Sequence, residues 1–310
     1  MGLCAGILLG ILALYRANVL LFFPAACFFL LRWRKSGRSV LFTLLFTGGL
    51  LAAIAPAALH NYLAEKDFLL ITSNAGFNLF AGNRMEASGL FEMPEGLNFS
   101  EDPSGRRIAE RESGRELKSS EVSRYWMRKT LQDIRGNPFR IVRLAGVKTL
   151  YFWGRAEIAQ IYGLRAMRSL VPALSWPLVG FSLVGPLSII GIFLAIRDNN
   201  RELFPAAGCV FLYYLSLLPF FITARYRLPI MPLLCLFSAY AMVCLWVAIH
   251  RHRPRRAISL LIAWILLFIA LDNESLLPFK YEKAHFHNSP GLLLQKEDPW
   301  RMLQGNTGNP

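Results

Sequence analysis

The chain has 310 residues, of which 54% are hydrophobic and 13% aromatic, and its mean hydropathy is +0.37. This apolar excess is larger than a soluble protein of this length needs, so it favours a membrane protein with several spans. The formal net charge is +14, and the basic residues are divided among separate loops. The division argues against nucleic acid as a partner, and it indicates membrane orientation and contact with the phosphates of a lipid bilayer instead.

The five cysteines, Cys4, Cys27, Cys209, Cys235 and Cys244, all lie in apolar runs. Their positions predict neither a disulfide framework nor a metal site, and we interpret them as small buried hydrophobic side chains. The sequence therefore assigns no metal-binding residue and no cofactor, although it leaves a divalent metal open.

The first apolar run, residues 1–14, is shorter than the roughly 17 to 20 residues that cross a bilayer, and no charged segment precedes it. It does not resemble a secretory signal peptide. We expect the chain to begin partway into a membrane helix, as a fragment or from a late start codon. Gly6 and Gly10 form a small-xxx-small pair, which predicts the close approach of another helix.

Further apolar runs follow, each without a charged residue. With the first run they predict an all-α polytopic membrane protein with about seven transmembrane helices and an α-rich, outward-facing insert. Uncharged spans argue against an ion-coupled transporter or a proton pump, which need ionisable groups at membrane depth. These runs are 19–31, 40–59, 172–196, 203–222, 228–249 and 257–271.

The predicted domains follow from these runs. They are three N-terminal membrane helices (1–59), an extracytoplasmic insert (60–170), four C-terminal membrane helices (171–271) and a polar extracytoplasmic tail (272–310).

The short loops between the runs alternate in charge. Loops 32–38, 197–202 and 250–256 are rich in Arg and Lys, whereas the short loops on the other side hold few basic residues. Because basic loops stay in the cytoplasm, the alternation places the insert and the tail outside it. The insert itself does not bear on this assignment, since long loops cross a membrane regardless of charge.

The insert opens with residues 73–83, which hold two glycines, three asparagines and two phenylalanines. This composition disfavours a helix or a strand and predicts an ordered loop at the membrane mouth of a site. The alternative is a turn-rich connection to a surface domain.

The remainder of the insert is predicted to be partly helical. Residues 85–120 are polar and predict a mobile loop. Two amphipathic helices follow, the first ended by Gly136-Asn137-Pro138 and the second over residues 139–152. The many basic residues between positions 106 and 143 are interpreted as a solvated face.

A cationic motif, Arg225-Tyr226-Arg227, lies at the outer end of an apolar run, where arginines oppose the orientation bias. Two guanidinium groups at headgroup depth, with a tyrosine between them, suit a lipid phosphate or pyrophosphate. The alternative is contact with ordinary phospholipid headgroups. Arg16 and Lys148 are further candidates for the same phosphate, with a solvated helix face as the alternative for Lys148.

Several motifs occur along the chain in a fixed order. They are residues 73–78 and 81–83, Gly89-Leu90-Phe91, Tyr125-Trp126, Asn137-Pro138-Phe139, Lys148, Phe152-Trp153 and residues 225–232. In this order they resemble bacterial glycosyltransferases of family 39, which group with protein mannosyltransferases and the lipid A aminoarabinose transferase in the GT-C superfamily. The resemblance runs from about residue 6 to about residue 271, and the chain is similar to the later half of such enzymes.

The resemblance implies transfer of a sugar from a polyprenyl-phosphate-linked donor to a glycan, lipid or protein acceptor on the outer face of the bacterial inner membrane. In such enzymes an aspartate of the first outer loop acts as the base, and cations stabilise the leaving lipid phosphate. That loop would precede Met1, so no catalytic residue is assigned here.

The resemblance also implies site residues. It implies that Arg225 and Arg227, with Tyr226 between them, lie on the phosphate side. A site-lining loop would contain Asn74, Gly76, Asn78 and Asn83.

Two other function classes stay open. An O-antigen ligase or polymerase also has many spans and a large outer loop with arginines. A non-catalytic membrane scaffold would instead use the insert and the tail to bind other envelope proteins.

Overall fold

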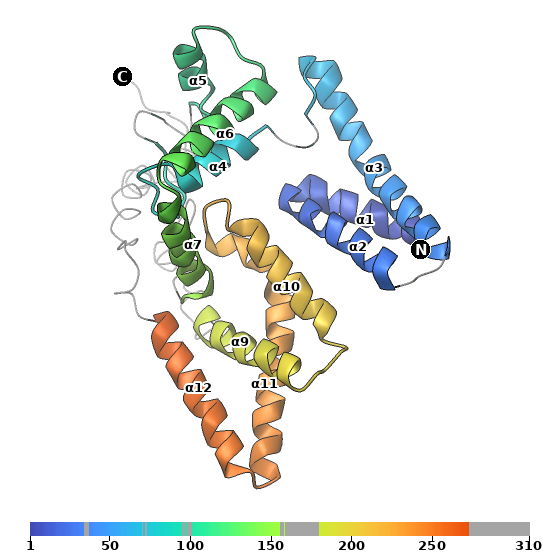
Figure 1. Ribbon diagram of the computed structural model, residues 1–310, viewed down its shortest axis with the longest axis vertical. Helices are drawn as coiled ribbons and strands as arrows, with labels where there is room; N and C mark the ends of the chain where they lie inside the picture. Colours follow the sequence, from blue (N-terminus) through green and yellow to red (C-terminus); the bar gives the residue numbers. More distant parts are fainter. Residues whose placement is uncertain are drawn as a thin grey trace, which may run out of the picture.

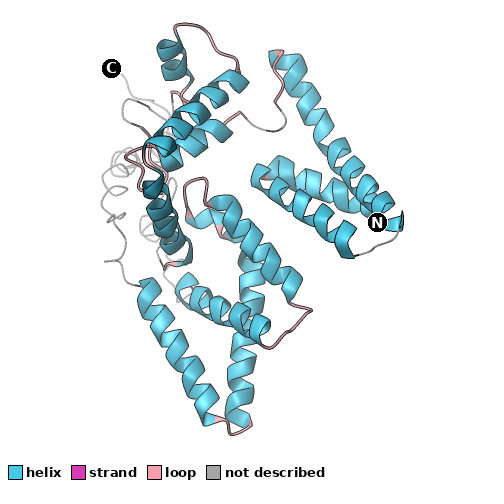
Figure 2. Cartoon of the chain, viewed as in Figure 1, coloured by secondary structure: helices cyan, strands magenta, loops and turns pink. Residues whose placement is uncertain are grey.

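The computed structural model describes residues 1–33, 37–69, 71, 73–94, 97, 101–155, 158 and 180–272. Every regular element in these residues is a helix, which confirms the predicted all-α class (Figure 2). Several predictions fall wholly or partly outside them, among them the loop 85–120 and the end of the insert 60–170. The others are the tail after Asp272, the beginning of the run 172–196 and part of the basic loop 32–38.

The N-terminal helices form a unit in which two backbones touch. It consists of α1 (Gly2–Tyr15), the 3-10 turn η1 (Ala17–Leu21), α2 (Phe22–Trp33) and α3 (Gly37–Glu65). A Cβ added at Gly6 of α1 would overlap the carbonyl oxygen of Phe46 in α3, and one at Gly10 would lie 2.5 Å from the Cβ of Ala53. The close approach predicted for Gly6 and Gly10 is therefore confirmed, with α3 as the partner.

The C-terminal helices pack as a second unit. It consists of α9 (Phe181–Arg197), α10 (Phe204–Leu217), the 3-10 turns η3 (Ala224–Tyr226) and η4 (Leu228–Ile230), α11 (Met231–His250) and α12 (Pro254–Asp272). Helix α9 lies directly on α11, where the hydroxyl of Ser238 donates to the carbonyl of Val184 at 3.0 Å. Helix α12 packs against both, with Trp264 beside the buried Ile190 and Ala241.

Three helices are long and apolar enough to cross a membrane. They are Gly37–Glu65, Ala224–His250 and Pro254–Leu271, with mean hydropathies of 2.0, 2.1 and 1.8. Large apolar side chains on their outer faces, such as Leu44, Trp246 and Leu266, are exposed. A surface of this kind is stable in lipid rather than in water, so the structure supports the prediction of a membrane protein.

The other predicted spans correspond to shorter apolar helices. They are Gly2–Tyr15, Ala17–Leu31, Phe181–Arg197 and Phe204–Leu217. A 14-residue helix such as α1 is about 21 Å long, whereas the hydrocarbon core of a bilayer is about 30 Å thick. The crossing of the membrane by all seven predicted helices therefore stays a prediction.

The insert contains four helices in the described residues. They are α4 (Ala75–Asn83), α5 (Arg106–Ser113), α6 (Ser119–Gly136) and α7 (Pro138–Trp153). Helices α6 and α7 confirm the two predicted amphipathic helices and the break between them. At that break the side chain of Asn137 accepts a hydrogen bond from the backbone N–H of Arg140 at 3.2 Å, and Pro138 begins α7.

The ordered loop predicted for residues 73–83 is wrong, because most of this segment is helix α4. Gly76 lies so close to α6 that an added Cβ would overlap the carbonyl oxygen of Ser123. Phe77 packs edge-on against Trp126, with ring centroids 5.5 Å apart. These contacts with α6 stabilise a helix that its glycine and asparagine content disfavours.

The loop predicted for residues 85–120 is wrong over α5. The carboxylate of Asp102 accepts hydrogen bonds from the backbone N–H groups of Arg106 at 2.8 Å and Arg107 at 2.9 Å, and these bonds begin the helix. Ala109 of α5 is buried in the cluster around Trp126. A capped first turn and one buried face are therefore enough to form this short helix.

Asp67 joins the end of α3 to the start of α6. Its carboxylate accepts hydrogen bonds from the backbone N–H and the hydroxyl of Ser120, both at 2.6 Å. Burial raises the pKa of Asp67, but the two hydrogen bonds from Ser120 outweigh it and bring the pKa below its ordinary value. The carboxylate therefore caps α6 from outside its own segment.

Connections between successive apolar helices lie at different ends of the structure (Figure 1). The α9–α10 and α11–α12 connections lie away from the helices of the insert, whereas the α10–α11 connection faces them. The insert therefore covers one end of the C-terminal unit.

The packing of α4 on α6 predicts the effect of substituting Gly76. In Gly76→Ala the new methyl group overlaps a backbone oxygen of α6, so we expect the free energy of unfolding to fall by about 1–3 kcal/mol. The matched control is Gly146→Ala, in the middle of α7 with no atom within 4 Å of the added Cβ. That control should gain up to about 1 kcal/mol. Denaturant unfolding in detergent checks both, and a Gly76→Ala protein as stable as Gly146→Ala would contradict the α4–α6 contact.

Candidate functional site

Several candidate site residues lie in or against residues 218–230, which we call the α10–α11 connection. The end of α4 lies against it, because a Cβ added at Gly82 would be 2.6 Å from the carbonyl carbon of Phe220. The backbone N–H of Ile222 donates to the carbonyl of Gly89 at 2.9 Å. The connection is therefore held against the insert along its first half.

Arg16, Arg225 and Tyr226 come together at this connection, and we call them the Tyr226 cluster. The guanidinium carbon of Arg16 lies 4.9 Å from the centroid of the Tyr226 ring, and that of Arg225 lies 5.4 Å from it. Arg225 is exposed, whereas the other two residues are half-buried. Three of the predicted phosphate-binding residues thus share one place, although Arg16 is far from the others in sequence.

Neighbouring elements position this cluster. The side-chain amide of Asn18 in η1 donates to the hydroxyl of Ser216 in α10 at 3.0 Å, so the turn that follows Arg16 is tied to the C-terminal unit. On the other side the Tyr226 ring contacts Phe221, with centroids 5.7 Å apart. The tyrosine therefore has a fixed place against which both arginines lie.

The Tyr226 cluster is suited to an anion. A guanidinium group that lies over a ring still has the N–H groups of its edge available for hydrogen bonds. Within the described ranges, neither Arg16 nor Arg225 forms an ion pair with a carboxylate. The two cations can therefore meet an external anion without first breaking an internal salt bridge.

Arg227, which was predicted to lie on the phosphate side, is buried and contacts other residues than Arg225 does. Its side chain is only 2% exposed, it donates to the backbone carbonyl of Tyr151 at 2.8 Å, and its guanidinium carbon lies 4.3 Å from the centroid of Phe181. These contacts join the α10–α11 connection to α7 and α9. Arg227 is therefore packed between α7 and α9 and is not part of the Tyr226 cluster.

Lys148 of α7 is 1% exposed, so the predicted alternative of a solvated helix face is wrong for it. Its ammonium group donates to the side-chain oxygen of Asn83 and to the carbonyl of Leu218, both at 2.9 Å. The amide group of Asn83 in turn donates to the carbonyl of Pro219 at 2.5 Å. Asn83 and Lys148 thus form one buried polar group at the α10–α11 connection.

The location of Lys148 explains why a buried lysine is tolerated. Asn83 ends α4 and Leu218 follows the last residue of α10, so the ammonium group lies between two helix C-termini. Helix C-termini carry partial negative charge and unpaired carbonyl groups. Burial, and then the nearby Arg140, nevertheless lower the pKa of Lys148 to about 7.

Arg140 is an important residue that the sequence reasoning missed. Its guanidinium group donates to the carbonyl of Arg84 at 2.8 Å, to that of Met85 at 3.3 Å and to that of Asn83. Arg140 of α7 therefore provides hydrogen-bond donors for the carbonyl groups at the C-terminal end of α4. The sequence shows Arg140 only as one of many basic residues in the insert, so no local pattern distinguishes it.

The remaining predicted site residues lie along α4. Asn74 is exposed before its first turn, Asn78 is half-buried on it, and Gly76 is buried against α6. The backbone N–H of Gly76 donates to the hydroxyl of Ser123 at 3.0 Å. Gly76 therefore serves helix packing, and of the four predicted residues of this segment only Asn83 has a contact with the α10–α11 connection that the structure establishes.

Within the part of the chain that the structure describes, no three His, Cys, Asp or Glu side chains lie close enough to hold a metal ion. The chemistry of the described site is that of cations, an amide and aromatic rings.

The buried ammonium group predicts a dependence of stability on pH. Between about pH 7 and pH 10.5 the unfolded chain keeps a proton that folded Lys148 has lost. The free energy of unfolding should therefore rise with pH in this window, by at most about 1.4 kcal/mol per pH unit, and be lowest below pH 7. Lys148→Met should abolish the rise, as measured by denaturant unfolding at pH 7.5 and pH 9.5 in detergent.

Lys129→Met is the matched control, because the pKa of Lys129 is raised and not lowered, with burial opposing the shift and hydrogen bonds to Glu112 and Tyr125 favouring it. This variant should keep the rise of the unmodified protein. An equally steep rise in Lys148→Met would show that another group causes the pH dependence.

Comparisons of this chain with protein-family models, curated proteins and solved structures find no match. The functional conclusion therefore depends on the geometry of the site and on the motifs of the sequence.

Proposed function

We propose that this chain is a membrane glycosyltransferase of the GT-C type. In this proposal it transfers a sugar from a polyprenyl-phosphate-linked donor to a glycan, lipid or protein acceptor. The reaction takes place on the outer face of a bacterial inner membrane. The sequence motifs that resemble family 39 suggest this reaction, and the Tyr226 cluster supplies the physical support for it.

The observation that carries the proposal is the position of two arginines on one tyrosine ring. Arg16 and Arg225 come from the ends of two different apolar helices and lie 4.9 Å and 5.4 Å from the Tyr226 centroid. A phosphate on a membrane-anchored carrier is held at the boundary between hydrocarbon and water. Arginine is suited to this position because its planar fork binds phosphate oxygens through two parallel hydrogen bonds.

The same cations suit the chemistry of the transfer. The bond between the anomeric carbon and the phosphate oxygen breaks, an acceptor oxygen forms the new bond to that carbon, and the acceptor proton passes to a base. Negative charge grows on the departing phosphate during this step. Arg16 and Arg225 would stabilise that charge, while the buried Lys148 and Arg227 hold the connection in place.

Two features support the proposed orientation. The α10–α11 connection, which contains Arg225, faces the insert, and the two other connections of the C-terminal unit lie away from it (Figure 1). Those two connections hold Arg197, Arg201, Arg251 and Arg253. A basic cytoplasmic side with the insert outside agrees with this distribution.

The first test is binding of undecaprenyl phosphate to the full chain in phosphatidylcholine nanodiscs. Arg16→Gln combined with Arg225→Gln should weaken binding at least tenfold, because each lost hydrogen bond between charged groups contributes about 1.5–3 kcal/mol. The control, Arg201→Gln combined with Arg253→Gln, removes the same charge from the opposite side and should change affinity less than twofold.

Substitutions of Tyr226 test whether its ring positions the two arginines for phosphate binding. Tyr226→Phe keeps the ring and should retain the affinity within twofold, whereas Tyr226→Leu removes the surface on which both arginines lie and should weaken binding several-fold. Unchanged binding in the double arginine variant would contradict the proposed phosphate site and favour a non-catalytic scaffold.

The orientation is tested by labelling with a membrane-impermeant maleimide on intact cells. In a background with the five native cysteines replaced, Asn74→Cys should react from outside, because residue 74 is exposed on the insert. Arg201→Cys, on the α9–α10 connection, should react only after the inner membrane is permeabilised. Labelling of position 74 only from the cytosol would reverse the proposed orientation.

A further inference from the structure

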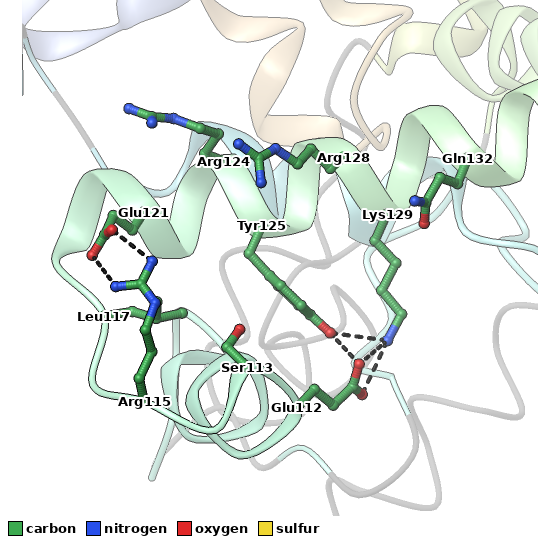
Figure 3. Close-up of a pocket in the computed structure, with 10 residues that line it drawn as sticks. All are labelled: Glu112, Ser113, Arg115, Leu117, Glu121, Arg124, Tyr125, Arg128, Lys129 and Gln132. Carbon is green, nitrogen blue, oxygen red and sulfur yellow. Dashed lines mark hydrogen bonds and ion pairs between the residues drawn. The ribbon is translucent and has the colours of Figure 1, made fainter.

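A polar cavity lies between α5 and α6, on elements that do not contribute to the Tyr226 cluster (Figure 3). Its volume is about 330 Å³. Gly114, with φ +68°, ends α5 in the left-handed conformation and lets the chain turn back towards α6. We call this cavity the α5–α6 pocket.

Two fixed ion pairs form the walls of the α5–α6 pocket (Figure 3). On one side the ammonium group of Lys129 lies 3.0 and 3.1 Å from the two carboxylate oxygens of Glu112, which also accept a hydrogen bond from Tyr125. On the other side Arg115 donates to the carboxylate of Glu121 at 2.8 and 3.3 Å. One pair therefore joins α5 to α6, and the other joins the connection after Gly114 to α6.

Both carboxylates in these walls are ionised at neutral pH. Hydrogen bonds from Tyr125 and then Lys129 lower the pKa of Glu112, and those from Arg115 lower the pKa of Glu121 to about 2. Each negative charge is thus matched by one positive charge at hydrogen-bonding distance. The acidic residues of the pocket do not neutralise any further cation through an ion pair.

Arg124 and Arg128 supply the excess charge. Both are exposed and lie one helical turn apart on α6. Neither forms a hydrogen bond or a close ion pair with another described residue, and the charge of Arg124 adds only a minor contribution to the lowered pKa of Glu121, after the hydrogen bonds from Arg115 and Lys118. Residues at this spacing have Cβ atoms about 6 Å apart on the same helix face. Both arginines are lining residues of the pocket, and Figure 3 shows them on α6 beside Tyr125 and Lys129, which project towards α5. The pocket therefore has two positive charges more than it has negative ones.

We propose that the α5–α6 pocket binds a phosphate group carried on a sugar. Two arginines side by side match the charge of a phosphate dianion and its oxygens. Uncharged polar groups of Ser113 and Gln132 also line the pocket and suit the hydroxyl groups of a sugar. The volume is at the lower end of the range of small-molecule sites, as a monosaccharide phosphate requires.

The structure also indicates from which side the ligand arrives. Helices α5 and α6 lie at the end of the molecule opposite the α11–α12 connection (Figure 1). The pocket is on the insert and not on a candidate span, so the phosphate reaches it from the aqueous phase, as a soluble or glycan-borne group. This site does not depend on the proposed transferase function.

The experiment is calorimetric titration of the full chain, in phosphatidylcholine nanodiscs, with glucose 1-phosphate, inorganic phosphate and glucose. Glucose 1-phosphate should bind at least tenfold more tightly than either of the others. Arg124→Gln combined with Arg128→Gln should weaken its binding at least tenfold. The matched control, Arg135→Gln combined with Arg143→Gln, removes the same charge from exposed positions outside the pocket and should change it less than twofold.

Every other outcome counts against the site. An equal loss of affinity in the two double variants would show that net charge, and not the pocket, causes the effect. Equal affinities for glucose 1-phosphate and glucose would show that the pocket does not recognise the phosphate. Equal affinities for glucose 1-phosphate and inorganic phosphate would show that the pocket does not recognise the sugar. In nanodiscs containing phosphatidylglycerol the affinity should be unchanged, and a tenfold loss would show that lipid headgroups occupy the pocket.

Discussion

The buried ammonium group of Lys148 donates one hydrogen bond that joins α7 to α4 within the insert and a second that joins the insert to the C-terminal unit. Their acceptors, the side-chain oxygen of Asn83 and the carbonyl of Leu218, lie at the C-terminal ends of α4 and α10. Taking an ammonium group out of water is unfavourable, and the partial negative charge of two helix ends offsets part of this cost. The same contact fixes the start of the α10–α11 connection, on which the Tyr226 cluster depends.

The positive charge of the chain consequently has several separate uses. Lys148, Arg140 and Arg227 are buried or half-buried, and each donates to a backbone carbonyl of another element. Arg16 and Arg225 instead lie over the Tyr226 ring and keep their hydrogen-bonding edges available. A buried cation stabilises the fold where carbonyl groups would otherwise lack donors, whereas a partly exposed one retains its charge for an external anion. The net charge of +14 is therefore a sum over groups that have different physical roles.

The accuracy of the sequence-based predictions follows the range of the interactions involved. Gly6 and Gly10 predicted a close helix contact, and the break at Gly136-Asn137-Pro138 was predicted correctly, because both depend on local backbone geometry. Helix α4 was predicted as a loop, since its composition is unfavourable and its stability comes from Trp126 and Ser123 in α6. For the candidate site, the pattern around Tyr226 was visible in the sequence. The separation of Arg227 from Arg225 was not, because residues two positions apart in a turn can face opposite environments.

The sequence by itself determined that the chain is helical and membrane-associated, because hydrophobic runs and their periodicity depend only on the order of residues. It also determined which residues are cationic, but not which of them become buried. The tertiary structure decided that Arg16 meets Tyr226, that Lys148 is enclosed, and that Arg124 and Arg128 have no ion-pair partner among the described residues. These outcomes depend on contacts between segments far apart in the chain, and such contacts are set by how the helices pack rather than by any local pattern.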